Sequence, residues 1–119
     1  MNFKTFACVI FGLVSMSVQA QSNYPNRPIK LVVGFVAGGV SDVMARILAP
    51  ELQKALGQPV VVENKPGGSG IIAAQSVMAS PADGYTLLLA NTSMLTINPH
   101  TFSKLPYDTD KSFKHVTNF

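Results

Sequence analysis

The residues best suited to chemistry in this chain follow its first apolar run. Gly38 and Gly39 stand directly behind that run, with Ser41 and Asp42 beyond them. Because glycine lacks a Cβ atom, the backbone can turn sharply there and leave its N–H groups open to a ligand. A helix that begins here would direct its free N–H groups and the positive end of its dipole to the same place. Such a turn can bind a carboxylate or a phosphate, but a glycine pair is a weak motif, and by itself it favours a plain strand-to-helix turn.

Two side chains of this stretch have a structural interpretation beside a functional one. Ser41 can donate its hydroxyl to a carboxylate, or it can cap the N-terminus of the helix, where serine is favoured. The carboxylate of Asp42 would repel an anionic ligand, so we favour a stabilising interaction with the helix dipole. The alternative for Asp42 is a pairing with the amino group of an amino-acid ligand.

A second set of polar residues follows a later apolar run. Asn91, Thr92 and Ser93 stand where the third predicted strand ends, and their hydroxyl and amide groups can donate hydrogen bonds to a ligand. Plain turn chemistry is the alternative, and we favour the ligand role. The glycine-rich turn over residues 64–70 is better explained by tight packing between turn and helix.

Alternating strand and helix patterns position these residues. Apolar and β-branched runs predict strands over residues 29–35, 60–63 and 86–90, and helical spacing predicts helices over residues 42–56 and 71–79. Pro50 should kink the first helix, and Gly57 should end it. The strand–helix order predicts an α/β fold with a parallel sheet, so all three turns lie at the carboxyl edge where such sheets bind ligands. A short helix or irregular segment should follow to about Lys104, then a loop, and residues 113–119 should begin a further strand.

The composition excludes several functions. The 119 residues carry a net charge of +3, without a basic cluster interleaved with aromatics, so nucleic-acid binding is not expected. Neither a dinucleotide-binding glycine pattern, a P-loop nor a hydrolase G-x-S-x-G is present, and histidine and acidic residues lack metal-ligand spacing. We therefore expect no catalytic residue, metal or cofactor.

The first twenty residues have the pattern of a signal peptide. Lys4 precedes an apolar core over residues 6–14, and small residues at Val18 and Ala20 suit a cleavage site after Ala20. The apolar run is shorter than the roughly 18 residues that a membrane-spanning helix needs. The single cysteine, Cys8, lies inside this segment, so the mature chain from Gln21 has neither disulfide nor cysteine nucleophile. These features predict an exported protein of the periplasm.

With these residues in view, the sequence resembles the tripartite tricarboxylate transporter substrate-binding receptors, also called the Bug family. Many short matches in the same order carry the resemblance, and together they are more specific than any glycine motif. They are YPNRP at 24–28, the first strand at 29–35, AGG with an aspartate at 37–42, LGQPVVVEN at 56–64, PG at 66–67, DGYTLL at 83–88, INPH at 97–100 and LPYD at 105–108.

The resemblance implies a periplasmic binding protein of two three-layer α/β domains that close about a hinge on a small carboxylate. The ligand would be a di- or tricarboxylate, an aromatic carboxylate or an amino acid, captured for transport or sensing. Such a receptor is not an enzyme, and we expect a monomer that passes its ligand to a membrane transporter. The resemblance also changes the interpretation of the first turn: Ala37, Gly38 and Gly39 are expected to contact the carboxylate through backbone N–H groups or a bridging water.

Family chains are considerably longer than this one. Residues 21–119 are therefore expected to form the N-terminal portion of the first ligand-binding domain and to end near the crossover to the second. Two alternatives stay open at this point. One is an exported α/β enzyme with its catalytic residues in the missing part, and the other is a truncated fragment without function.

Overall fold

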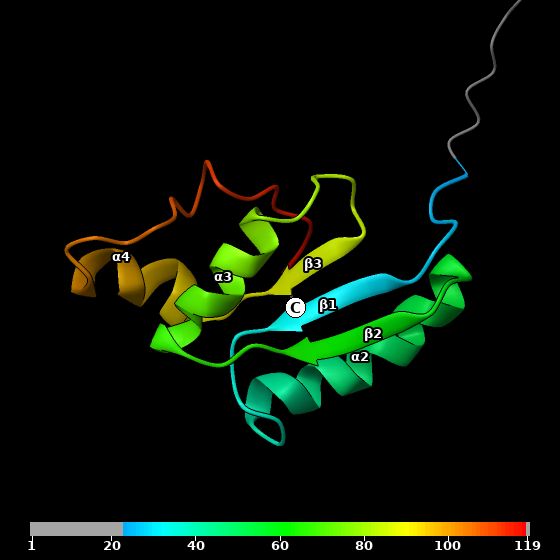
Figure 1. The fold of residues 1–119 in the computed structure, drawn as a ribbon. Coiled ribbons are helices and arrows are strands. Elements are labelled where there is room, and N and C mark those ends of the chain that lie inside the picture. The colour runs from blue at the N-terminus through cyan, green and yellow to red at the C-terminus, as the bar shows by residue number, and fades with distance from the viewer. Residues whose placement is uncertain (1–22, 119) are drawn as a thin grey trace, which may run out of the picture.

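The chain forms a three-stranded parallel sheet with helices on both faces, as the sequence predicts (Figure 1). The computed structural model describes residues 23–118. Strand β1 (Ile29–Val33) lies at the centre, between β2 (Val60–Asn64) and β3 (Thr86–Leu89). Both pairings are parallel, and Val33 is opposite Asn64 on one side and Leu89 on the other. The three strands therefore end at one common edge.

Helix α2 (Val40–Leu56) covers one face of the sheet, and α3 (Ile71–Met78) covers the other. The small residues Ala45 and Ala49 are buried on the inner face of α2 and allow this helix to approach the sheet closely. Side chains of alternate strand positions fill the space under each helix, as expected for a sheet covered on both faces. The buried core residues on the α2 side are Leu31, Val33, Ala45 and Leu89, and those on the α3 side include Ala74, Met94 and Tyr107.

Helix α2 begins two residues earlier than the sequence predicts and continues through Pro50 without ending. Proline removes one backbone hydrogen bond, and the buried residues Ala45 and Ala49, which precede it, pack the helix against the sheet. The predicted stop is confirmed, because Gly57 adopts a left-handed conformation and its N–H donates to the carbonyl of Gln53 at 2.9 Å.

The segment after β3 is helical in two short pieces, η2 (Ser93–Ile97) and α4 (Asn98–Thr101), in agreement with the prediction for this region. The strand predicted over residues 113–119 is wrong for the part that the structure describes, residues 113–118. A strand is stabilised by backbone pairing, and this segment joins no ladder of the sheet. At the start of this segment, the ring of Phe113 instead packs edge-on against the ring of Tyr107, with ring centroids 5.8 Å apart.

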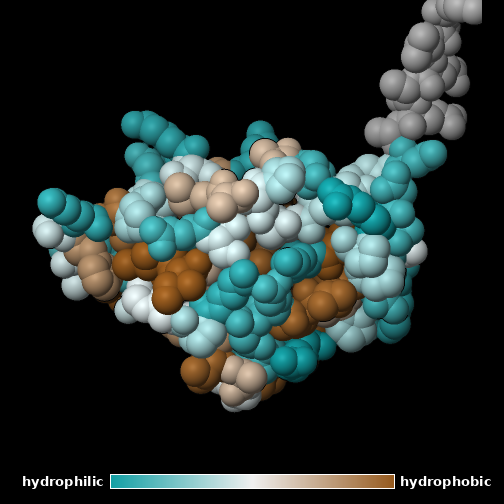
Figure 2. Space-filling model, in the orientation of Figure 1, coloured by the Kyte–Doolittle hydropathy of each residue, from teal (hydrophilic) through white to brown (hydrophobic). Residues whose placement is uncertain are grey.

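Apolar residues also reach the surface. Figure 2 shows several hydrophobic patches on one face, separated by hydrophilic side chains. In the part of the chain from residue 23 to 118, no helix is long and apolar enough to cross a membrane. The predicted signal peptide, residues 1–20, lies outside the described residues.

Candidate ligand-binding site

A hollow of about 470 Å³ lies at the carboxyl edge of the sheet, beside the N-terminus of α2. One wall comes from the first residues of that helix, and the other comes from the end of β3 and the polar segment behind it. This is the edge where open α/β sheets bind ligands. The residues lining the hollow are Val40, Ser41, Met44, Leu89, Ala90, Asn91, Thr92, Leu95, Thr96, Thr117 and Asn118.

Three of the seven predicted ligand-binding residues meet at this hollow. Ser41 comes from α2, while Asn91 and Thr92 come from the segment after β3. Ser41 does not cap the helix: the N-cap is Gly39, without a side-chain hydrogen bond, so the capping interpretation is wrong. Ser93 is half-buried at the start of η2 and does not line the hollow.

Asn91 combines turn chemistry with an available donor. Its Oδ1 accepts a hydrogen bond from the N–H of Met94 at 3.2 Å, and its carbonyl accepts from the N–H groups of Met94 and Leu95, each at 3.1 Å. Among residues 23–118 the amide NH₂ group of Asn91 has no hydrogen-bond acceptor. The structural role therefore uses only the acceptors of Asn91 and leaves two donors beside the hollow.

The first glycine turn is arranged differently from the prediction. The N–H of Gly38 donates to Oδ2 of Asp42 at 2.8 Å, and the N–H of Gly39 donates to the carbonyl of Val36 at 3.2 Å. Ala37, Gly38 and Gly39 all lie outside the lining of the hollow. The structure thus gives two of the three expected N–H donors other partners.

Free backbone donors instead occur one and two residues after the glycine pair. The N–H groups of Val40 and Ser41 are in the first turn of α2, where no carbonyl of the preceding turn accepts them among the described residues. Both residues line the hollow. The positive end of the helix dipole lies at the same place, so this wall favours an anion.

Asp42 is buried inside a hydrogen-bond network rather than exposed to the hollow. In addition to the N–H of Gly38, its carboxylate accepts bonds from Nε of Arg46 at 2.9 Å and from Nδ2 of Asn64 at 2.9 Å. The Arg46 guanidinium, then the Gly38 N–H and the Asn64 amide, hold the pKa of the Asp42 carboxyl well below its usual range. The preference for a structural role is confirmed, although hydrogen bonds provide it in addition to the helix dipole.

Sequence reasoning missed several partners. Arg46 stands four residues after Asp42 on one helix, a spacing that could have identified the ion pair. Asn64 comes from β2, and only the parallel register brings it close, so local sequence carried no signal for it. Thr117 and Asn118 were placed in a strand, and the structure puts them at the hollow.

In the part of the chain that the structure describes, no ionisable side chain lines the hollow. An anion there would be bound by neutral donors, namely hydroxyls, amides and the N–H groups of the first turn of α2. The apolar residues of the lining provide contacts for the carbon skeleton of a ligand. Among residues 23–118, no group of three or more histidine, aspartate or glutamate side chains could hold a metal ion.

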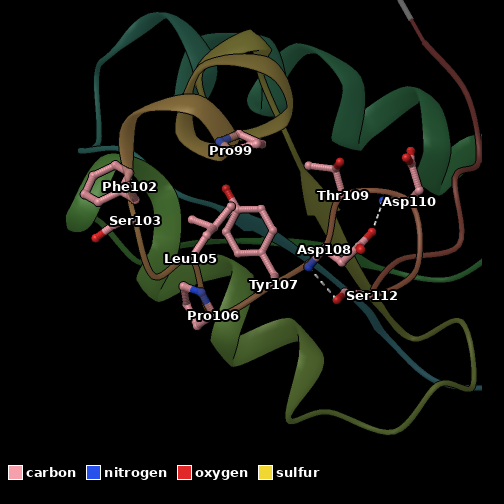
Figure 3. A pocket seen from close by; sticks show the side chains of 10 residues that line it. All are labelled: Pro99, Phe102, Ser103, Leu105, Pro106, Tyr107, Asp108, Thr109, Asp110 and Ser112. Carbon is pink, nitrogen blue, oxygen red and sulfur yellow. Dashed lines mark hydrogen bonds between the residues drawn. The ribbon is translucent and has the colours of Figure 1, made fainter.

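A second hollow, of about 690 Å³, lies beside α4 (Figure 3). Its polar groups stabilise the loop itself: Oδ1 of Asp108 accepts from the N–H groups of Asp110 and Lys111, and the N–H of Asp108 donates to Oγ of Ser112. These backbone donors, that of Lys111 first, lower the pKa of the Asp108 carboxyl. Since Asp108 and Ser112 are already bonded within the loop, this hollow is not our candidate site.

Comparisons with known proteins agree with this architecture. Residues 44–119 match the family model described as the tripartite tricarboxylate transporter family receptor. A UPF0065 protein of Bordetella bronchiseptica is 46% identical over 110 residues, which cover 92% of this chain and 32% of the relative. The chain therefore spans about a third of the length of the curated relatives it matches.

Two solved structures are similar to this fold. MatC from Rhodopseudomonas palustris with bound malate is 38% identical, with a TM-score of 0.73, over 76% of this chain and 31% of that one. The periplasmic binding protein BugD is 41% identical, with a TM-score of 0.72, over 76% of this chain and 30% of that one. Both similarities support the assignment to a periplasmic-binding-protein-like domain.

Proposed function

Because the chain belongs to the tripartite tricarboxylate transporter family of receptors, we propose that it forms part of an extracytoplasmic receptor for a small carboxylate. The hollow beside α2 would receive one carboxylate group of the ligand. Family membership also favours a binding role over the exported enzyme considered from the sequence.

The observation that carries this proposal is the meeting of Ser41, Asn91 and Thr92 around one hollow. These residues were selected from the sequence as hydrogen-bond donors, and they come from two segments far apart in the chain. Their donors converge beside a helix N-terminus, where the dipole favours negative charge. Convergent polar groups beside apolar side chains are typical of small-molecule sites.

The same geometry indicates the chemical class of the ligand. Neutral donors can bind a carboxylate, and the apolar lining suits a short carbon skeleton such as that of the malate bound by MatC. Asp42 is turned into its own network and does not line the hollow. We therefore place a di- or hydroxycarboxylate ahead of an amino acid whose amino group would need that carboxylate.

The proposal includes a location and a partner. Residues 1–20 would direct the chain to the periplasm, and the receptor, acting as a monomer, would pass its ligand to a membrane transporter. In the longer receptor, residues 21–119 would belong to the first of two ligand-binding domains.

A residue-resolved titration tests the proposal. The exported chain, residues 21–119, is titrated with a panel of small mono-, di- and tricarboxylates that includes malate, and backbone and side-chain amide signals are followed by NMR. Because the chain would supply only the first of the two ligand-binding domains, we expect weak binding, with a dissociation constant on the order of millimolar. We expect the signals of Val40, Ser41 and the Asn91 side chain to move, and malamide, the uncharged diamide of malate, to leave them in place. Shifts confined to other regions, or chemical conversion of the acid, would contradict a binding site here.

A further inference from the structure

Asn64 links the β1–α2 loop to the start of α2, whose first residues form one wall of the hollow. It is the last residue of β2, opposite Val33 of β1. One hydrogen of its Nδ2 group is donated to the carbonyl of Phe35 at 3.1 Å, and the other to Oδ1 of Asp42 at 2.9 Å. Its Oδ1 lies 3.4 Å from Nη2 of Arg46, which donates to it. One side chain thus binds the beginning of the β1–α2 loop and the first turn of α2.

The two residues that accept hydrogen bonds from Asn64, Phe35 and Asp42, stand on either side of the loop and helix start in the sequence. Between Phe35 and Asp42 lie the first glycine turn and then Val40 and Ser41, which line the hollow. The other oxygen of Asp42 accepts the N–H of Gly38, so the loop is also fixed at its middle. Asn64 itself does not line the hollow.

We propose that Asn64 is a positioning residue, which holds the N–H groups of Val40 and Ser41 where a ligand carboxylate meets them. This inference rests on the proposed function, because it assigns Asn64 to the same site. Asn64 acts through Asp42 and the Phe35 carbonyl, and it does not touch the ligand.

The chemistry of the amide explains why an asparagine suits this position. Aspartate has the same shape but would place a second carboxylate against Asp42, where the amide now donates at 2.9 Å. Two carboxylates this close raise the pKa of one of them, and a shared proton restores a hydrogen bond between them. Asn64→Asp should therefore disturb the loop at high pH and repair it in part at low pH, because the shared proton restores the bond to Asp42 but not the bond to the Phe35 carbonyl.

The charged groups near this position are few. Arg46 faces both Asp42 and Asn64 from α2. Glu63 and Lys65 flank Asn64 in sequence and pair with each other at 3.1 Å, and Glu63 also pairs with Lys30 of β1 at 2.9 Å. Lys30 and Lys65 are thus paired with the charge of Glu63. The carboxylate added by Asn64→Asp would therefore interact mainly with Asp42 and Arg46.

The test compares Asn64→Asp, Asn64→Ser and the wild-type chain at about pH 8 and about pH 4, so that the lower value lies below the raised pKa known for a coupled carboxylate pair, about 4.7. Malate affinity is expressed relative to wild type at each pH, which cancels the titration of malate. The amide signal of Gly38 is read without ligand. Gln75→Glu, on an exposed position of α3, is the matched amide-to-acid control.

For Asn64→Asp we expect malate affinity to fall about tenfold at the higher pH and to recover in part at the lower one, where the bond to Asp42 returns and the bond to the Phe35 carbonyl does not. The Gly38 amide signal should move and return in parallel. Asn64→Ser should lose affinity at both pH values, because it has no proton to regain, and Gln75→Glu should change nothing. Asn64→Ser also supplies the answer if Asn64→Asp does not fold.

Folded Asn64 variants with wild-type affinity and an unmoved Gly38 signal would overturn the positioning role. If the wild-type chain binds no carboxylate, the proposed function fails instead, and the Gly38 signal alone then decides whether Asn64 holds the loop.

Discussion

Two glycine turns follow neighbouring strands of one sheet, and different forces hold them in place. The first, residues 36–39, is fixed by hydrogen bonds, chiefly the bond from the Gly38 N–H to Asp42. A Cβ atom on Gly38 would meet nothing within 4 Å. The second, residues 67–70, has a hydrogen bond from Nδ2 of Asn98 to the Ser69 carbonyl at 3.0 Å, but close packing distinguishes it: Gly70 is buried, and a Cβ atom there would lie 2.6 Å from Sδ of Met94.

The contrast separates a turn that can serve a binding site from one that is part of the core. The first turn leaves space at the surface and leads into the free N–H groups of α2. The second turn is packed closely against its neighbours. Even a Cβ atom on Gly34, which follows β1, would lie 2.8 Å from the Cα of Gly70. A glycine pair in a sequence thus indicates a turn, and the surrounding side chains decide what the turn does.

The largest effect is expected for Gly70→Ala. Gly70 has φ +87°, and the added methyl group would overlap the Met94 side chain, whose Sδ, Cγ and Cε lie 2.6–3.0 Å away. Left-handed strain and overpacking should together lower the free energy of unfolding by roughly 2–4 kcal/mol. Urea denaturation measures this loss, and a cost no larger than that of alanine at Gly38 would contradict the packing account.

Asp42→Asn should have the next largest effect on stability. It removes the charge from a buried group that accepts bonds from Arg46, Gly38 and Asn64, so the loop and the helix start lose a shared anchor. Because the pKa of Asp42 is lowered on folding, its contribution is present above the unfolded pKa of about 4 and is lost as the pH falls through the folded value.

Denaturation of wild type and Asp42→Asn across the acid range measures this contribution. The difference in the free energy of unfolding between wild type and Asp42→Asn should be constant near neutrality and should shrink as the pH falls below about 4. A difference in the free energy of unfolding that stays the same from neutrality down to about pH 2 would mean that folding does not lower the pKa of Asp42. That result would place it outside the network.

The sequence was sufficient for the sheet, both helices and the carboxyl edge, because apolar periodicity and turn residues are local signals. It also placed Ser41, Asn91 and Thr92 at that edge. It could not show that Gly38 donates to Asp42, because that bond depends on the path of the loop. Asn64 was missed for the same reason, since its partners come together only through the strand register and the helix docking.

Ser41→Ala should change ligand binding while leaving stability nearly level. Its hydroxyl has no hydrogen-bond partner among residues 23–118, so folding loses little with it. If that hydroxyl donates to the ligand, malate affinity should fall about three- to tenfold. Malate titration and thermal melting of the same sample separate the two effects. Wild-type affinity in this variant would remove Ser41 from the site.

Gly38→Ala should have the smallest effect on ligand binding and completes the comparison of the two turns. Gly38 has φ +82°, so alanine carries left-handed strain of about 1–2 kcal/mol, but nothing lies within 4 Å of the new methyl group. Gly70→Ala carries similar backbone strain, and the difference between the two variants therefore isolates the overpacking against Met94. Since the Gly38 N–H is already bound to Asp42 and lies outside the hollow, malate affinity should stay within about twofold of wild type. A large loss of affinity at unchanged stability would show that the first glycine turn contacts the carboxylate directly, as the family resemblance implied.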